Sequence, residues 1–215
     1  MSRHAFKRRQ SGFTLIEIAI VLVIIGLLLG GILKGQELIN SARVKNLASD
    51  FRNVPVFIYG YQDKFRSLPG DDSAAATHLT NATNASTPGT PGNGVIEGDW
   101  NSTTATDESF LFWQHVRLAG LAPGPTTVAA ADYRPKNAAG GDLGVQSSAP
   151  FTGITASTYY VCSSSILGKF VKQLDTQLDN GDTATGAMIA GTTLPTPVAT
   201  NAIVDSTQYI VCMGI

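Results

Sequence analysis

Residues that perform catalysis are scarce in this sequence of 215 amino acids. It has three histidines, His4, His78 and His115, and none of them lies in a known catalytic or metal-binding spacing. A Gly-x-Ser-x-Gly elbow, a His-Glu-x-x-His pair and a glycine-rich phosphate loop are all missing. Serine and threonine are abundant, but no base accompanies any of them in a recognisable pattern. We therefore predict that the protein is not an enzyme.

An excess of basic residues is also missing, which argues against nucleic acid as a partner. The chain has 15 Lys and Arg against 16 Asp and Glu, and four of the basic residues lie within positions 1–12. From residue 13 onward 11 basic residues face 16 acidic ones, which gives a formal charge of −5. Such a balance is not typical of a domain that binds a polyanion.

Charge is almost absent from residues 13–33, where Glu17 is the one charged residue among 21. A helix of this length covers about 30 Å, the thickness of the hydrocarbon core of a bilayer. Basic residues precede the run, and the positive-inside rule places that end in the cytoplasm. The remainder of the chain is then exported. Residues 34–37 form a poor signal-peptidase site, so we expect the apolar run to stay on the protein.

A carboxylate inside a membrane-length apolar run is costly to bury, so Glu17 requires a functional explanation. The string Gly12-Phe13-Thr14-Leu15-Ile16-Glu17, which follows a short basic leader, resembles the prepilin signature of type IV pilins and type II secretion pseudopilins. The resemblance implies that a prepilin peptidase cleaves between Gly12 and Phe13, and that the new Phe13 amine is methylated. It also implies that Glu17 pairs with the N-terminal amine of a neighbouring subunit during filament assembly. The alternative interpretation of Glu17 is an acid that snorkels to the membrane surface.

The apolar helix is predicted to continue beyond the membrane as an amphipathic helix. Between Val44 and Leu68, apolar residues recur at alternating spacings of three and four, which is typical of one buried helix face. Pro55 lies within this pattern, where proline tends to bend a helix. The chain is thus expected to divide into a cleaved leader at 1–12, a transmembrane and filament-core helix at 13–35, the amphipathic half of that helix at 36–68, and a globular head at 69–215.

The head is predicted to be an α+β domain with an antiparallel sheet, because its 147 residues are enough for one core and show short helix and strand patterns. Residues 71–101 are expected to form loop. Helices are expected at 106–120 and 165–178, and strands at 140–147, 158–162, 187–190 and 208–213. A long N-terminal helix followed by such a head matches the ladle shape of the pilin family.

Two cysteines are present, Cys162 and Cys212, and both lie in apolar, strand-like segments. In an exported domain such a pair favours one disulfide, which would close a loop of about 50 residues. It would also resemble the C-terminal disulfide loop of many pilins. Two buried, reduced thiols are the alternative. A metal site at these cysteines is not expected, because no histidine and no third cysteine lies near them.

Two acidic segments offer oxygen atoms that a calcium ion could use. Asn93, Glu97 and Asp99 lie at alternating positions of the first segment. The acids at 71–72 could complete its ligand set in space, and several pseudopilins bind calcium in the head. The second segment, 175–182, is also typical of a helix that ends in a glycine turn. Neither segment has the EF-hand order, and a solvated turn is the alternative interpretation of both. No other cofactor is predicted.

Three functions are compatible with these features. The first is a structural subunit of a type IV pilus, used for adhesion, twitching motility or DNA uptake. The second is a pseudopilin of a type II secretion system. The third is a monomeric membrane-anchored binding protein, which would need neither Glu17 nor a prepilin junction.

The family resemblance also implies partners and a location. The partners are homologous pilin subunits, a prepilin peptidase and the inner-membrane assembly platform. Before assembly the subunit crosses the bacterial inner membrane once, with its N-terminus in the cytoplasm. After assembly it lies in a periplasmic or extracellular filament.

Overall fold

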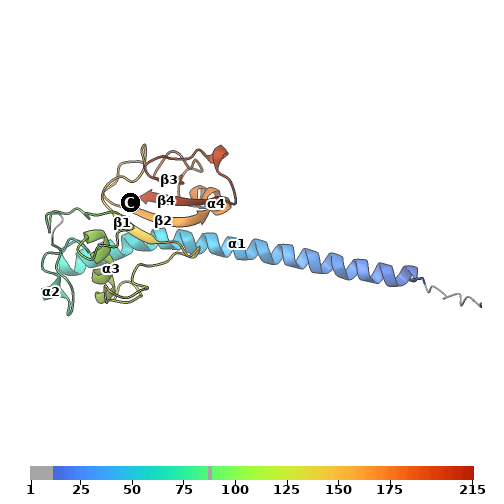
Figure 1. The fold of residues 1–215 in the computed structure, drawn as a ribbon, viewed down its shortest axis with the longest axis horizontal. Coiled ribbons are helices and arrows are strands. Elements are labelled where there is room, and N and C mark those ends of the chain that lie inside the picture. The colour runs from blue at the N-terminus through green and yellow to red at the C-terminus, as the bar shows by residue number, and fades with distance from the viewer. Residues whose placement is uncertain (1–11, 87–88) are drawn as a thin grey trace, which may run out of the picture. The chain divides into compact units, whose positions relative to one another are not determined.

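A computed structural model describes residues 12–86 and 89–215 (Figure 1). The predicted leader at 1–12 lies outside the described residues, apart from Gly12. The elements are, in chain order, α1 Leu15–Phe65, α2 Ala75–His78, α3 Glu108–Leu118, β1 Leu143–Gln146, β2 Tyr160–Leu167, α4 Gly168–Leu178, β3 Met188–Gly191, a short 3-10 helix Thr200–Ala202, and β4 Gln208–Gly214. The predicted fold class is confirmed: a long N-terminal helix precedes a small α+β head with a four-stranded antiparallel sheet.

The chain divides into two compact units, Met1–Ser41 and Ala42–Ile215, and α1 contributes residues to both. In the first unit, an 18-residue window of α1 has a mean hydropathy of 2.9 and buries none of its residues. By length and composition this part of α1 is able to cross a membrane. Its apolar side chains are therefore available to lipid or to another protein chain.

In the second unit, α1 buries one face in the core of the head. The buried residues Val44, Leu47, Phe51, Val54, Ile58 and Tyr61 recur at the predicted spacings of three and four, and Ala48 is buried beside them. Each large apolar side chain that is fully buried contributes about 1.5–3 kcal/mol, so this face holds the helix firmly to the head. The helix continues through Pro55 and ends at Phe65, and the next residue, Arg66, has a left-handed φ of 57°.

The sheet has the strand order β1-β2-β4-β3, and each neighbouring pair is antiparallel. Successive residues of a strand point to opposite faces of the sheet. Val161 and Val211 belong to the large core that also contains the buried face of α1. Tyr160, Cys162 and Cys212 belong to a smaller cluster instead, which contains aromatic residues of the connecting segments.

Two parts of the head differ from the predicted elements. The strand expected at 158–162 continues to Leu167, so the helix expected from residue 165 begins at Gly168. The strand continues because the pairing with β4 shifts register between Ser163 and Ile166, a bulge in which Ser165 takes a left-handed φ of 60°. The second difference is α2, a four-residue helix inside the segment expected to be loop.

Candidate functional site

The predicted processing junction lies immediately before α1. Residues 12–14 are exposed and outside the helix. The Phe13 side chain is 84% exposed, and a Cβ added at Gly12 would meet none of the described residues within 4 Å. A peptide bond in an exposed, non-helical segment is open to a peptidase. The geometry therefore leaves the Gly12–Phe13 bond accessible.

Glu17 forms a capping box with Thr14 at the start of α1. The backbone N–H and the hydroxyl of Thr14 both donate to Glu17 Oε2 at 2.8 Å. The Glu17 N–H donates to the Thr14 hydroxyl oxygen at 3.3 Å. Such a reciprocal pair satisfies backbone donors that have no partner in the first turn of a helix. The Thr-x-x-Glu spacing that signals this box is present in the sequence and is the signal from which the capping role of Thr14 could have been predicted.

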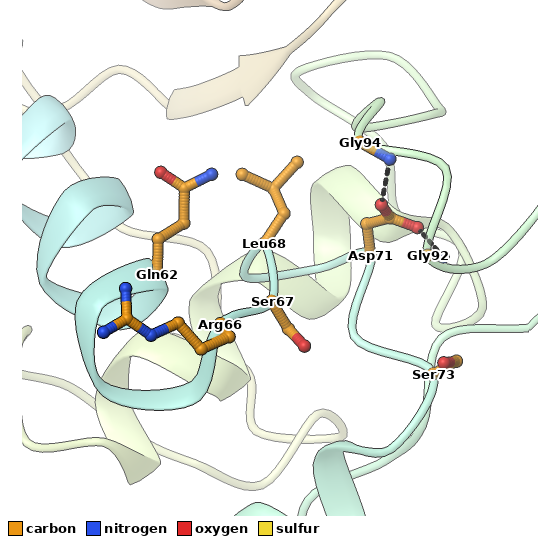
Figure 2. A pocket seen from close by; sticks show the side chains of 8 residues that line it. All are labelled: Gln62, Arg66, Ser67, Leu68, Asp71, Ser73, Gly92 and Gly94. Carbon is orange, nitrogen blue, oxygen red and sulfur yellow. Dashed lines mark hydrogen bonds between the residues drawn. The ribbon is translucent and has the colours of Figure 1, made fainter.

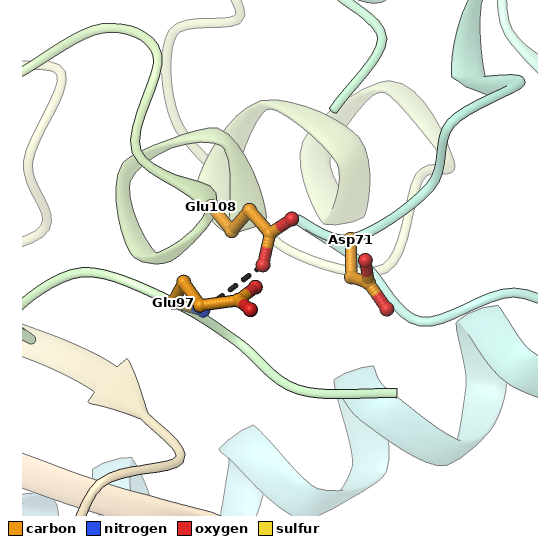
Figure 3. Close-up of side chains that lie close together, drawn as sticks. All are labelled: Asp71, Glu97 and Glu108. Atoms are coloured by element: carbon orange, nitrogen blue, oxygen red, sulfur yellow. Dashed lines mark hydrogen bonds between the residues drawn. The ribbon is translucent and has the colours of Figure 1, made fainter. Parts of the chain in front are cut away.

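Three carboxylates from separate parts of the head lie close together (Figure 3). Asp71 follows α1, Glu97 lies in the loop before α3, and Glu108 is the first residue of α3. One oxygen atom from each lies within 4.8 Å of the other two. Asp71 and Glu108 are buried, and Glu97 is half-buried.

Asp71 is held by two backbone amides of a glycine-rich loop (Figure 2). Its carboxylate accepts hydrogen bonds from the N–H groups of Gly92 and Gly94, the latter at 2.7 Å. These glycines have φ values of 81° and 84°, which a residue with a side chain rarely adopts. The same loop residues line a cavity of about 210 Å³ that Asp71 also borders.

Glu97 and Glu108 are held by donors on one oxygen each. Glu108 Oε2 accepts a hydrogen bond from the backbone N–H of Glu97 at 2.9 Å. Glu97 Oε1 accepts one from the side-chain amide of Asn93 at 2.7 Å. Burial raises the pKa of Glu108 well above its usual range, and the adjacent Glu97 carboxyl adds to the rise. The Glu108 carboxyl in turn lowers the pKa of Glu97.

The structure brings together only part of the ligand set that the sequence predicts for calcium. Glu97 is in the cluster, and Asn93 contacts it through its amide nitrogen. The Asn93 oxygen is used locally and accepts a hydrogen bond from the Val95 N–H at 2.7 Å. Asp99 is not one of the three clustered acids, and its backbone carbonyl accepts a hydrogen bond from the hydroxyl of Ser109.

Of the two acids at 71–72, only Asp71 joins the cluster. Asp72 accepts a hydrogen bond from the Tyr61 hydroxyl at 2.8 Å and pairs with His78 Nδ1 at 2.7 Å. Glu108 was not a predicted ligand. Its position in the sequence indicates only the first turn of a helix, and its place beside Asp71 depends on how α3 packs.

Cys162 and Cys212 form a disulfide that joins β2 to β4 at directly opposite positions. Both residues are completely buried, and Trp100, Phe151 and Ile189 belong to the same cluster. The structure thus contains the favoured disulfide and not the alternative pair of reduced thiols.

Asp50 is a partly buried acid on the part of α1 that packs in the head. Its Oδ2 atom is buried and accepts no hydrogen bond from any described residue. Burial raises its pKa from the ordinary value of 3.8 to about 6. At a pH between these two pKa values the folded protein therefore binds more protons than the unfolded chain. The contribution of the protonated Asp50 carboxyl to the stability of the fold is present below pH 4 and is lost as the pH rises through 6.

We expect Asp50→Asn to raise the free energy of unfolding at pH 7 by about 1 kcal/mol, after discounting for partial exposure. The variant should also lose the fall in stability between pH 4 and 7. Urea unfolding of the processed protein in detergent micelles at four pH values measures both effects. Asp63→Asn, an exposed acid on the same helix, is the matched control and should behave as wild type. An unchanged pH dependence in Asp50→Asn would show that this carboxyl has no raised pKa.

Comparison with known proteins identifies the N-terminal motif. Residues 7–33 match the family model described as the prokaryotic N-terminal methylation motif. No curated protein and no solved structure gave a significant match to the chain. The matched motif is the prepilin signature of type IV pilins and pseudopilins, and it includes Gly12, Phe13 and Glu17. The motif supports a pilin- or pseudopilin-like substrate of prepilin peptidase, and pilin-type proteins form a structural class, not an enzyme class.

Proposed function

We propose that this protein is a structural subunit of a type IV pilus-type filament, assembled through its N-terminal helix. The methylation motif at 7–33, which coincides with the exposed apolar part of α1, is the observation that carries the proposal. An apolar surface of this size is unfavourable in water. Membrane lipid covers it before assembly, and the same helices of other subunits cover it in the filament.

The proposed sequence of events begins at the leader. Prepilin peptidase removes residues 1–12 on the cytoplasmic side, and the new α-ammonium of Phe13 is methylated. The helix at 13–35 holds the subunit in the inner membrane by a single pass, and the head at 69–215 lies on the far side. The assembly platform then transfers the subunit into the filament. The head has no role in catalysis in this proposal.

Glu17 supplies the charge that pairs with an incoming subunit. Its Oε2 atom is occupied by Thr14, whereas Oε1 makes no hydrogen bond to any of the described residues. The carboxylate is exposed, so it can accept the Phe13 amine of a neighbour without leaving the capping box. Pairing the two charges removes the cost of holding each of them alone in an apolar medium.

A pseudopilin of a type II secretion system is the second candidate function. The disulfide and the long head, rich in Thr and Ala, support a pilus subunit. The cluster of Asp71, Glu97 and Glu108 supports the pseudopilin, because several pseudopilins bind calcium in the head. A monomeric membrane-anchored protein is less well supported, since an anchor alone needs no methylation motif.

Replacing Gly12 by leucine tests the processing step directly. Wild type should lose residues 1–12 and gain an N-methylated Phe13, whereas Gly12→Leu should stay as the uncleaved precursor. A Cβ added at Gly12 meets nothing within 4 Å among the described residues, so we attribute the loss to the access that the peptidase needs to this peptide bond. Intact-mass spectrometry of membrane fractions from cells that contain the peptidase gives the measurement.

Gly26→Leu is the matched control, because a Cβ at Gly26 also meets nothing within 4 Å. It should be processed as wild type. Normal cleavage of Gly12→Leu would show that the junction lies elsewhere, and an intact wild-type N-terminus would overturn the proposed function.

A further inference from the structure

The clustered acids of the head have the spacing of ligands to one ion. Their three oxygen atoms lie within 4.8 Å of one another. Two oxygen ligands of one calcium ion, each at 2.3–2.6 Å, are at most about 5 Å apart. Each pair of these oxygens is therefore close enough for both members to contact one ion.

Two carboxylate oxygens of this cluster are buried without a donor. Glu108 is 0% exposed, and its Oε1 atom accepts no hydrogen bond from the described residues. Oε2 of Glu97 is also buried and accepts no hydrogen bond from the described residues. In Figure 3 the Glu108 carboxyl lies between the other two, with one oxygen on the side of Asp71. A buried oxygen without a partner is costly, so these atoms require a cation or a proton.

Among the described residues, no cationic side chain pairs with this cluster. None of the ion pairs found between described residues includes Asp71, Glu97 or Glu108. Three neighbouring carboxylates repel one another when all are ionised. One proton shared by Glu97 and Glu108 would remove a single charge, whereas a divalent cation offsets two and also contacts the free oxygens.

We propose that Asp71, Glu97 and Glu108 bind one calcium ion. The donor atoms are all carboxylate oxygens, which favour a hard cation over zinc or copper. Calcium tolerates irregular geometry and accepts backbone or water oxygens for its remaining positions. The half-buried Glu97 and the cavity beside Asp71 provide the route of entry (Figure 2).

A bound ion would join three segments that are distant in the sequence. These are the turn after α1, the loop that carries Glu97, and the first turn of α3. Calcium would therefore fix the loops at this end of the head. This role does not rest on the filament proposal, because the ion would join these segments within a single chain.

The test uses the processed full-length protein in detergent micelles near pH 7.5. The protein is first freed of calcium with EGTA and is then titrated with calcium chloride. Equilibrium dialysis should find one calcium per chain, with a dissociation constant of about 10⁻⁴–10⁻³ M, as in extracellular modules. A tenfold excess over this constant should raise the Tm by about 3–6 °C.

Variants then separate this cluster from the calcium loop predicted from sequence. Glu108→Gln keeps the size of the side chain and its acceptor for the Glu97 N–H, and it should weaken calcium binding by at least about tenfold, since one of three charges is lost. Asp99→Asn removes a predicted ligand outside the cluster and should bind calcium as wild type. In EGTA, Glu108→Gln should melt no lower than wild type, because the amide carries no charge in this buried position.

Glu97→Gln is the second variant at the site and is used if Glu108→Gln melts lower than wild type in EGTA. Its partly exposed carboxyl can be changed with less risk to folding, and it should lose calcium to the same extent. The proposal is overturned if wild type binds no calcium at 10 mM, a concentration about tenfold above the weakest constant expected. Equal binding by wild type and the folded cluster variant, or loss of binding in Asp99→Asn alone, would overturn it as well.

Discussion

Glu17→Leu is expected to abolish filament assembly while leaving cleavage after Gly12 and membrane insertion intact. Leucine is cheaper than glutamate to place in lipid, so insertion does not suffer. Assembly is lost because leucine cannot form the ion pair with the Phe13 amine of the next subunit. Electron microscopy of filaments sheared from cells, labelled with an antibody to this subunit, gives the yield. Intact mass of the membrane pool reports cleavage in the same cells.

The capping box provides controls that separate charge from helix capping. Glu17→Gln keeps an oxygen that can accept the Thr14 hydrogen bonds but has no charge, so it should fail as leucine does. Thr14→Val removes the hydroxyl and keeps the charge, so it should still assemble, with a loss of about 1 kcal/mol at the helix start. Glu37→Gln, an exposed acid on the same helix that pairs with Lys34 at 2.7 Å, should assemble normally.

The outcomes distinguish the two roles of Glu17. Normal filaments from Glu17→Leu would refute the charge-pair mechanism. Normal filaments from Glu17→Gln, together with none from Thr14→Val, would show that the capping box is what assembly requires.

Removal of the disulfide should be the largest single loss of stability in the head. We expect Cys162→Ala combined with Cys212→Ala to lower the free energy of unfolding by about 4 kcal/mol, because the unfolded chain regains the freedom of a long loop. The sequence separation of the two cysteines is 50 residues, and both lie in the middle strands of the sheet. Guanidinium unfolding of the processed protein in micelles gives the value.

Reduction of the wild type is the control for this double variant. Dithiothreitol should lower the stability of the wild type to about that of the variant and should leave the variant unchanged. An ordinary substitution lowers stability by about 1 kcal/mol. A loss smaller than this in the double variant would mean that the disulfide constrains the unfolded chain little.

The elements of the fold are predictable from the sequence because they depend on local periodicity. The spacing of three and four from Val44 to Leu68 is enough to place the buried face of α1. Two features are not visible locally: α2 has only four residues, too few for a periodic pattern, and Ser165 adopts its left-handed φ only because β2 pairs with β4. The order of the strands also depends on contacts between distant segments.

The same distinction applies to the sites. The junction from Gly12 to Glu17 is contiguous, so a single string of residues carries its chemistry. The acid cluster is assembled from three segments, and only Glu97 was among the predicted calcium ligands, with Asp71 as a possible addition. Glu108 could not be foreseen, since the sequence does not show that the first turn of α3 faces Asp71.

If the head is exported as proposed, the strand order has a consequence for the moment at which the chain can complete its fold. β2 and β3 each pair with β4 and, within the described sheet, not with one another. β4 comes after both in the chain, so β1 and β2 can pair early while β3 has no partner until β4 has crossed the membrane. Cys162 likewise cannot form its disulfide until Cys212 has crossed the membrane. If α1 anchors the chain, the subunit is tethered to the membrane before its head is folded. A subunit with the Cys162–Cys212 disulfide formed is then one whose β4 has already crossed the membrane.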